Sequence, residues 1–66
     1  MSVLKVVEIL ANSPNSWEDA ARNAVKHAAL TIKNIKSVYI SEQSAVVNDN
    51  QITEFRVNAK ITFEVK

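Results

Sequence analysis

The sequence predicts an α+β fold with the element order β-α-β-β, and three observations support this prediction. From Phe55 to Val65 apolar and polar residues alternate at every position, which is the pattern of a strand with one buried and one solvated face. Alanines recur at helical spacing through residues 17–32. Segments 2–10 and 36–47 are rich in Val and Ile, which is typical of strands.

The first strand segment, SVLKVVEIL, is apolar on both of its faces. The residues that make it so are Val3, Val7 and Ile9 on one face and Leu4, Val6 and Leu10 on the other. A strand with two apolar faces is usually covered on both. We therefore expect one face to be covered by a partner subunit.

The helical segment follows the connection ANSPNS and begins after Ser16, a good N-cap residue. Asp19 gives a weak version of a capping box with Ser16. The alanine stripe continues to Ile35 if the helix persists that far, and Lys33 and Asn34 suit a helix C-terminus, with Asn34 able to adopt the left-handed conformation. Because the side chains of this stripe are mostly alanine, we expect the helix to lie close to a curved sheet.

The last two strands are joined by a turn at Asn48-Asp49-Asn50, because Asn and Asp tolerate positive φ and the chain has no glycine. A final strand of about thirteen residues spans roughly 40 Å, whereas a helix of about seventeen residues spans roughly 25 Å. We expect this strand to bend round the helix and its ends to reach other subunits.

Composition limits the classes of function. The 66 residues are expected to form a single domain, 1–66, with a marginal core, and without cysteine oligomerisation is the remaining means of stabilisation. A net charge of +1 indicates neither nucleic acid nor membrane partners. The N-terminal apolar run is too short and interrupted for a signal peptide, so we expect a cytoplasmic protein. No nucleophile–base pair, phosphate loop or two-histidine motif is present, so we expect no enzyme.

Three stretches of the sequence resemble the dodecin family: KVVEILANSPNSWEDAARNAV, TIKNIKSVYI and FRVNAKITFEV. The resemblance covers essentially the whole chain, and SPNSWEDAA is most similar to the short calcium dodecins. It implies a three-stranded, strongly curved antiparallel sheet wrapped round one helix, assembled as a hollow dodecamer. Flavin-binding members hold flavins between tryptophans of adjacent subunits, with a glutamine bonding the ring edge, and are not known as catalysts.

This chain departs from the flavin-binding pattern at two positions. Ser37 stands where the stacking tryptophan is expected, and Arg56 stands where the glutamine is expected. An aromatic contact with a flat ligand is worth about 1–3 kcal/mol, so flavin binding should be weak or absent. Trp17 lies in the first turn of the helix and cannot replace the missing ring; we expect it to anchor the helix on strand residues. Tyr39 could line the same pocket as Ser37 or fill a packing gap.

Charged residues leave further alternatives open. Arg56 could bind a phosphate or carboxylate, or could form a cross-strand or intersubunit ion pair with Glu42, Glu54 or another carboxylate. By the resemblance, Glu42 and Asn15 fall at or near cation-binding positions, where calcium would be held between subunits; the alternative is a plain surface role. The sequence thus predicts a homo-oligomeric shell that binds or stores a small molecule or ion. Its alternatives are a calcium-binding dodecin and a structural assembly without a small ligand.

Overall fold

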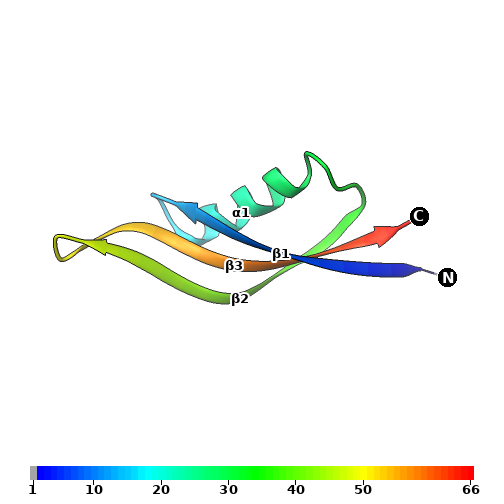
Figure 1. Cartoon of the computed structure of the whole chain (residues 1–66). Helices are drawn as coiled ribbons and strands as arrows, with labels where there is room; N and C mark the ends of the chain where they lie inside the picture. The colour runs from blue at the N-terminus through cyan, green and yellow to red at the C-terminus, as the bar shows by residue number, and fades with distance from the viewer. Residues whose placement is uncertain (1) are drawn as a thin grey trace.

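The computed structural model describes residues 2–66. It contains β1 (Val3–Ser13), α1 (Trp17–Ala28), β2 (Ile35–Asn48) and β3 (Gln51–Val65). The strands form one antiparallel sheet in the order β1-β3-β2, and α1 lies on one face of this sheet (Figure 1). The predicted α+β class, the β-α-β-β order and the curved sheet round a single helix are confirmed.

The alternating segment is the central strand β3, and its odd-numbered residues form the dry face of the sheet. Val57, Ala59 and Ile61 have no exposed surface, and the last two pack with Ala24 and Ala28 of α1. Fully burying a side chain such as Ile61 stabilises the fold by about 1.5–3 kcal/mol. The even-numbered residues of β3 therefore lie on the opposite face, away from α1, which we call the outer face.

The N-terminus of α1 is capped as the sequence predicts. Ser16 is the N-cap, and its hydroxyl accepts a 2.9 Å hydrogen bond from the backbone N–H of Asp19. The Asp19 carboxylate does not complete a capping box but accepts a 2.6 Å bond from the hydroxyl of Ser13, which is 1% exposed. The end of β1 is thereby fixed to the first turn of the helix.

The predicted end of the helix is wrong. α1 ends at Ala28 with Ala29 as C-cap, well before Lys33 and Asn34. A tight turn follows, in which Leu30 N–H donates to the carbonyl of His27 at 3.1 Å. Asn34 does adopt positive φ (63°), but it turns the chain into β2, and its carbonyl accepts from the N–H of Glu64. Apolar residues after position 28 reach the core from this turn and from β2, so they continue the helical spacing without continuing the helix.

The first strand is longer than the predicted segment 2–10. It runs to Ser13 because Ala11, Asn12 and Ser13 continue the register with β3, where Ser13 is paired with Phe55. The intervening connection to α1 is correspondingly short. Pairing with a long central strand therefore outweighs the low strand propensity of Ala11 and Asn12.

The predicted hairpin turn is confirmed. Asp49 and Asn50 have φ values of 54° and 63°, and Asn48 is paired with Gln51. Positive φ at both central residues is the requirement of a type I′ turn, whose twist matches that of the flanking strands. Asn and Asp meet it in a chain without glycine.

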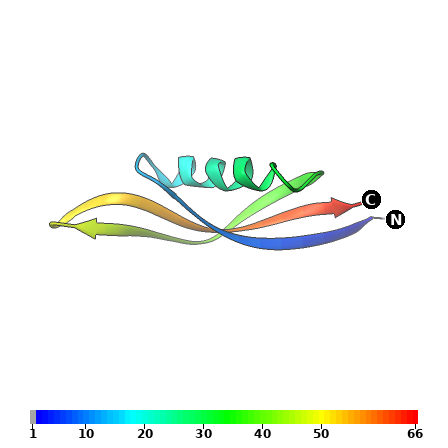
Figure 2. The ribbon, with the colours of Figure 1, turned by 45° about the horizontal axis from the view of Figure 1, so that its top comes forward.

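The sheet extends far beyond its helix. The chain measures 51 × 20 × 13 Å, and the β2–β3 hairpin projects past the start of α1 (Figure 2). On the outer face of β1, Leu4, Val6 and Leu10 are 56%, 58% and 65% exposed, so one copy leaves this apolar row uncovered. No helix within residues 2–66 has the length and apolar character needed to cross a membrane.

Candidate functional site

The outer face carries most of the residues that the sequence singles out. Side chains of paired residues on neighbouring antiparallel strands lie on the same side of the sheet. The partners of β3's outer-face residues on β2 are Ser37 opposite Thr62, Tyr39 opposite Lys60, Glu42 opposite Asn58, and Ser44 opposite Arg56. The predicted ligand residues Ser37, Tyr39 and Arg56 thus share one face with Glu42. Asn15 lies elsewhere, in the connection between β1 and α1.

Ser37 and Arg56 are nevertheless far apart within one copy. Arg56 is opposite Ser44, seven positions along β2 from Ser37 (37 to 44). At about 3.3 Å per residue this is a separation of roughly 20 Å. Tyr39, two residues from Ser37, is its near neighbour on this face. A small ligand that contacts both Ser37 and Arg56 would therefore have to lie between two copies.

Arg56 is held by a residue that the sequence analysis does not identify. Its Nε donates a 3.1 Å hydrogen bond to Oδ1 of Asn12, its register partner on β1. Neither Glu42 nor Glu54 forms an ion pair with it, and within residues 2–66 Arg56 has no carboxylate partner. A guanidinium group anchored through Nε can present its two terminal nitrogens to a carboxylate or phosphate. Only the strand register could have identified Asn12.

Trp17 is a packing anchor, as expected. Its ring meets Phe55 edge-on at a centroid distance of 4.8 Å and an angle of 74°. Its Nε1 donates a 2.8 Å hydrogen bond to the backbone carbonyl of Ser44. These contacts join the start of α1 to β2 and β3 and leave the indole far along β2 from Ser37, so Trp17 does not supply the missing stacking ring within its own copy.

The two predicted cation ligands do not form a metal centre in one copy. Glu42 lies on the outer face of β2, whereas the N–H of Asn15 donates a 2.9 Å bond to the Ser13 hydroxyl within the connection. Across residues 2–66, no three His, Asp or Glu side chains gather into a set that could hold a metal ion. Calcium takes six to eight oxygen ligands, so a site that uses Glu42 would need oxygens from other copies or from water.

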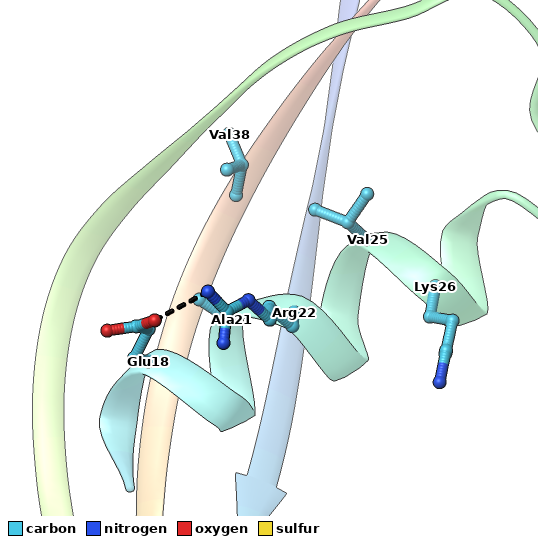
Figure 3. A pocket seen from close by; sticks show the side chains of 6 residues that line it. All are labelled: Glu18, Ala21, Arg22, Val25, Lys26 and Val38. Atoms are coloured by element: carbon cyan, nitrogen blue, oxygen red, sulfur yellow. Dashed lines mark ion pairs between the residues drawn. The ribbon is translucent and has the colours of Figure 1, made fainter.

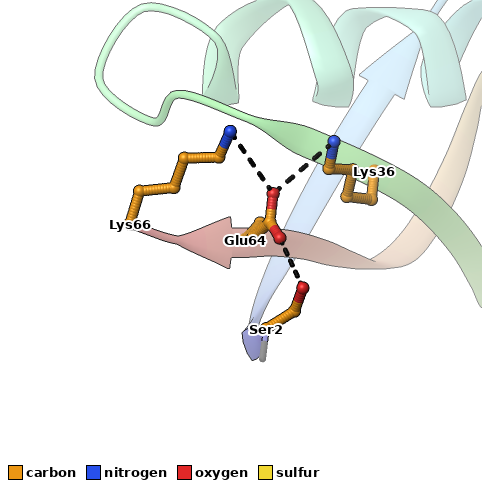
Figure 4. Close-up of polar contacts among 4 residues, drawn as sticks. All are labelled: Ser2, Lys36, Glu64 and Lys66. Carbon is orange, nitrogen blue, oxygen red and sulfur yellow. Dashed lines mark hydrogen bonds and ion pairs between the residues drawn. The ribbon is translucent and has the colours of Figure 1, made fainter.

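A second polar cluster joins the chain ends. The carboxylate of Glu64, whose side chain is only 18% exposed, accepts a 2.7 Å hydrogen bond from the hydroxyl of Ser2 (Figure 4). The same carboxylate lies 3.7 Å from Lys36 Nζ and 3.8 Å from Lys66 Nζ. These contacts fasten the ends of three strands to one another, and they indicate a structural role.

A groove of about 370 Å³ lies on the helix side of the sheet. Its residues are Glu18, Ala21, Arg22, Val25 and Lys26 of α1 and Val38 of β2 (Figure 3). Ala21, Val25 and Val38 make its wall apolar, and Glu18 and Arg22 form a 2.6 Å ion pair at its edge. The groove exists because α1 packs over β1 and β3 and leaves β2 largely uncovered.

The β-α-β-β fold is shared with dodecins of known structure. A family model for Dodecin matches residues 3–66, and the chain belongs to that family. It is similar to the calcium dodecin of Mycobacterium tuberculosis, with 33% identity over 66 residues that cover 100% of this chain and 93% of that protein. The likeness of sequence to a calcium dodecin, predicted from SPNSWEDAA, is thus confirmed.

Solved structures agree with this assignment. The dodecin from Streptomyces davaonensis is 28% identical, with a TM-score of 0.94 over 98% of this chain and 96% of that one. The calcium-chelating calcium dodecin of M. tuberculosis, whose structure has a calcium-binding site, is 33% identical, with a TM-score of 0.84 over 98% and 93%. A variant of the Thermus thermophilus dodecin is 21% identical with a TM-score of 0.95 over 100% and 98%, which shows the shared fold.

Proposed function

We propose that this dodecin assembles with copies of itself into a hollow dodecamer that binds or stores a small ligand or ion and catalyses no reaction. Family membership supports the assembly, as does the apolar outer row of Leu4, Val6 and Leu10, which one copy cannot cover. The observation that carries the proposal is the roughly 20 Å separation of Ser37 and Arg56 on one face. It makes a second copy necessary for any small site that includes both residues.

Flavin binding in this shell is proposed to be weak or absent. Ser37 offers a hydroxyl in place of an aromatic platform, and a symmetric site loses the stacking contact on both sides of the ligand. At about 1–3 kcal/mol per contact, this loss lowers the affinity for a flat ring by orders of magnitude. Tyr39 and the anchored Arg56 instead favour a ligand that carries an anionic group near a ring.

Native mass spectrometry of gently purified protein tests the proposal. It reads the number of subunits and the mass of any retained ligand in one measurement. We expect an assembly of dodecameric mass without bound flavin. A folded, stable single subunit in dilute solution would contradict the assembly, and a flavin retained through purification would contradict the second part of the proposal.

Calcium is the second candidate ligand, and one observation favours it. The relative at 33% identity is a calcium dodecin, and the chain covers nearly all of that protein's length. Glu42 stands exposed on the outer face without an ion-pair partner within the described chain 2–66. In this alternative, Glu42 contributes one carboxylate to a calcium site, and neighbouring copies in the assembly contribute the other oxygen ligands. Stability measurements with calcium and with a chelator distinguish it from an assembly that has no ligand.

A further inference from the structure

The groove between α1 and β2 is an uncovered apolar surface with charged edges. Val25 of α1 points toward β2, whereas Lys26 points the other way, and Glu18 and Arg22 are joined beside them (Figure 3). Because the Glu18 carboxylate is already paired with Arg22, Lys26 is the cation beside the groove that forms no ion pair within residues 2–66. An occupant of this groove should therefore be apolar at its centre and acidic at its flanks.

The hairpin arm, which we define as residues 46–54, has these properties. It projects past α1 (Figure 2), and its cross-strand neighbours Val47 and Ile52 are 63% and 54% exposed. The pair forms a small apolar knob just behind the turn. Isolated exposed apolar residues are ordinary, but a paired set on a projecting hairpin is a suitable anchor for a groove.

The charge of the arm complements that of the groove. The arm contains Asp49 and Glu54, and no Lys or Arg occurs between Lys36 and Arg56. Of the charged residues that line the groove, Glu18 and Arg22 neutralise each other in an ion pair, and Lys26 leaves the groove with a net charge of +1. Acidic residues therefore flank the apolar knob and the groove carries a net positive charge, which favours this pairing over contact between two acidic arms.

The arm cannot occupy the groove of its own chain. Val38 lies in the groove and Val47 lies in the arm, nine positions further along the same strand (38 to 47). This corresponds to roughly 30 Å, and the hairpin projects past the start of α1 instead of folding back over it (Figure 2). The occupant must come from another copy. Since groove and arm are different surfaces of one chain, their contact is heterologous and closes into a ring if the rotation permits.

We propose that the hairpin arm of one copy docks in the groove between α1 and β2 of a neighbouring copy, with Val47 and Ile52 against Val25 and Val38. This inference rests on the proposed homo-oligomer and adds a specific contact within it. It assigns the uncovered part of β2 to a neighbouring chain rather than to a ligand.

Single cysteines test the contact directly, because the natural chain contains none. A chain carrying Val25→Cys is co-expressed with a chain carrying Ile52→Cys, and the assembled protein is treated with a short bismaleimide. Any cross-link then joins two different molecules. A chain carrying Leu10→Cys, co-expressed with the Ile52→Cys chain, is the matched control. Leu10 is 65% exposed on the apolar outer row, so this pair tests whether the arm contacts that surface instead.

We expect the cross-linked dimer of the Val25→Cys and Ile52→Cys chains to exceed both homodimers and the Leu10→Cys product at least fivefold. A dominant homodimer of the Ile52→Cys chain would mean that arms pack together and would overturn the proposal. So would an excess of the Leu10→Cys product. A Val25→Cys thiol that remains freely reactive in the assembled protein would overturn it too, and would leave the groove to a small apolar molecule. Ultracentrifugation of the same samples separates these failures from a failure to assemble.

Discussion

The side chains of Arg56 and Asn12 are joined across two strands of the outer face by a 3.1 Å hydrogen bond. The two residues are register partners on β3 and β1, so the pairing of the strands brings them together. The bond orients a guanidinium group that has no carboxylate partner within residues 2–66. The bond thereby fixes the orientation of the Arg56 side chain on the outer face.

Substitution of Asn12 tests whether this bond serves stability or orientation. Asn12→Ala should lower the free energy of unfolding by no more than about 1 kcal/mol, because a single hydrogen bond between exposed partners contributes little. Guanidinium denaturation at a fixed protein concentration measures the change. A loss of several kcal/mol would mean instead that Asn12 and Arg56 support the contact between subunits.

Restoring the stacking platform should restore flavin binding. Ser37→Trp is expected to raise riboflavin affinity about 5- to 150-fold per aromatic contact, corresponding to 1–3 kcal/mol. Quenching of riboflavin fluorescence measures the affinity, and Ser37→Leu serves as the control that adds apolar bulk without a ring. No gain in Ser37→Trp would show that the shape of the pocket has diverged along with its residues.

Trp17 contributes through both its ring and its N–H. Trp17→Phe keeps an aromatic contact with Phe55 and loses the 2.8 Å bond to the Ser44 carbonyl, so it should cost about 1 kcal/mol. Trp17→Ala loses both and should cost about 3 kcal/mol or more. Circular dichroism during chemical denaturation gives both values. Equal costs would mean that the Ser44 bond carries the whole effect.

The close approach of α1 to the sheet depends on alanine. Ala24 is 1% exposed and packs with Ala59 and Ile61, so Ala24→Leu should overpack the core and cost about 1–3 kcal/mol. Ala29→Leu, at the exposed C-cap, is the matched control and should leave stability nearly unchanged. Thermal unfolding compares the two variants. A harmless Ala24→Leu would show that the helix can move away from the sheet without loss.

Calcium binding, if it occurs between copies, should appear as stabilisation. A ligand of the native state at 100 times its dissociation constant adds about 2.7 kcal/mol, so the melting temperature should rise with calcium and fall with a chelator. Glu42→Gln should abolish the difference while the fold is retained. Unchanged melting of the natural chain in calcium and in chelator would exclude this second candidate function.

Features that depend on residues close together in sequence were predictable. These are the alternation of β3, the hairpin turn and the Ser16 cap. The end of α1 was not predictable, because Ile32 and Ile35 continue the helical spacing while they pack from a turn and a strand. The periodicity of apolar residues predicts which residues are buried in the core. It does not predict whether the backbone there is helix, turn or strand.

The sequence names candidate site residues, but it does not give their relative positions, and their role in binding stays a prediction. Alternation places Ser37 and Tyr39 on one face of β2, whereas Glu42 shares that face only because of the register shift between Ile40 and Glu42. Their distances depend on register, and register is fixed by turns and bulges such as the shift between Ile40 and Glu42. The partner Asn12 of Arg56 depends on register in the same way, because 44 residues separate the two in sequence.

The cluster round Glu64 has a consequence for engineering. Val3 is paired with Val65, so the start of β1 and the end of β3 lie side by side, at the end of the sheet opposite the hairpin (Figure 1). A short loop could join these two strand ends as a new hairpin, and the chain could be reopened in the turn after Ala28, which belongs to no strand. Such a circular permutant would keep every strand pairing, and peptides fused to its new ends would be displayed beside the helix.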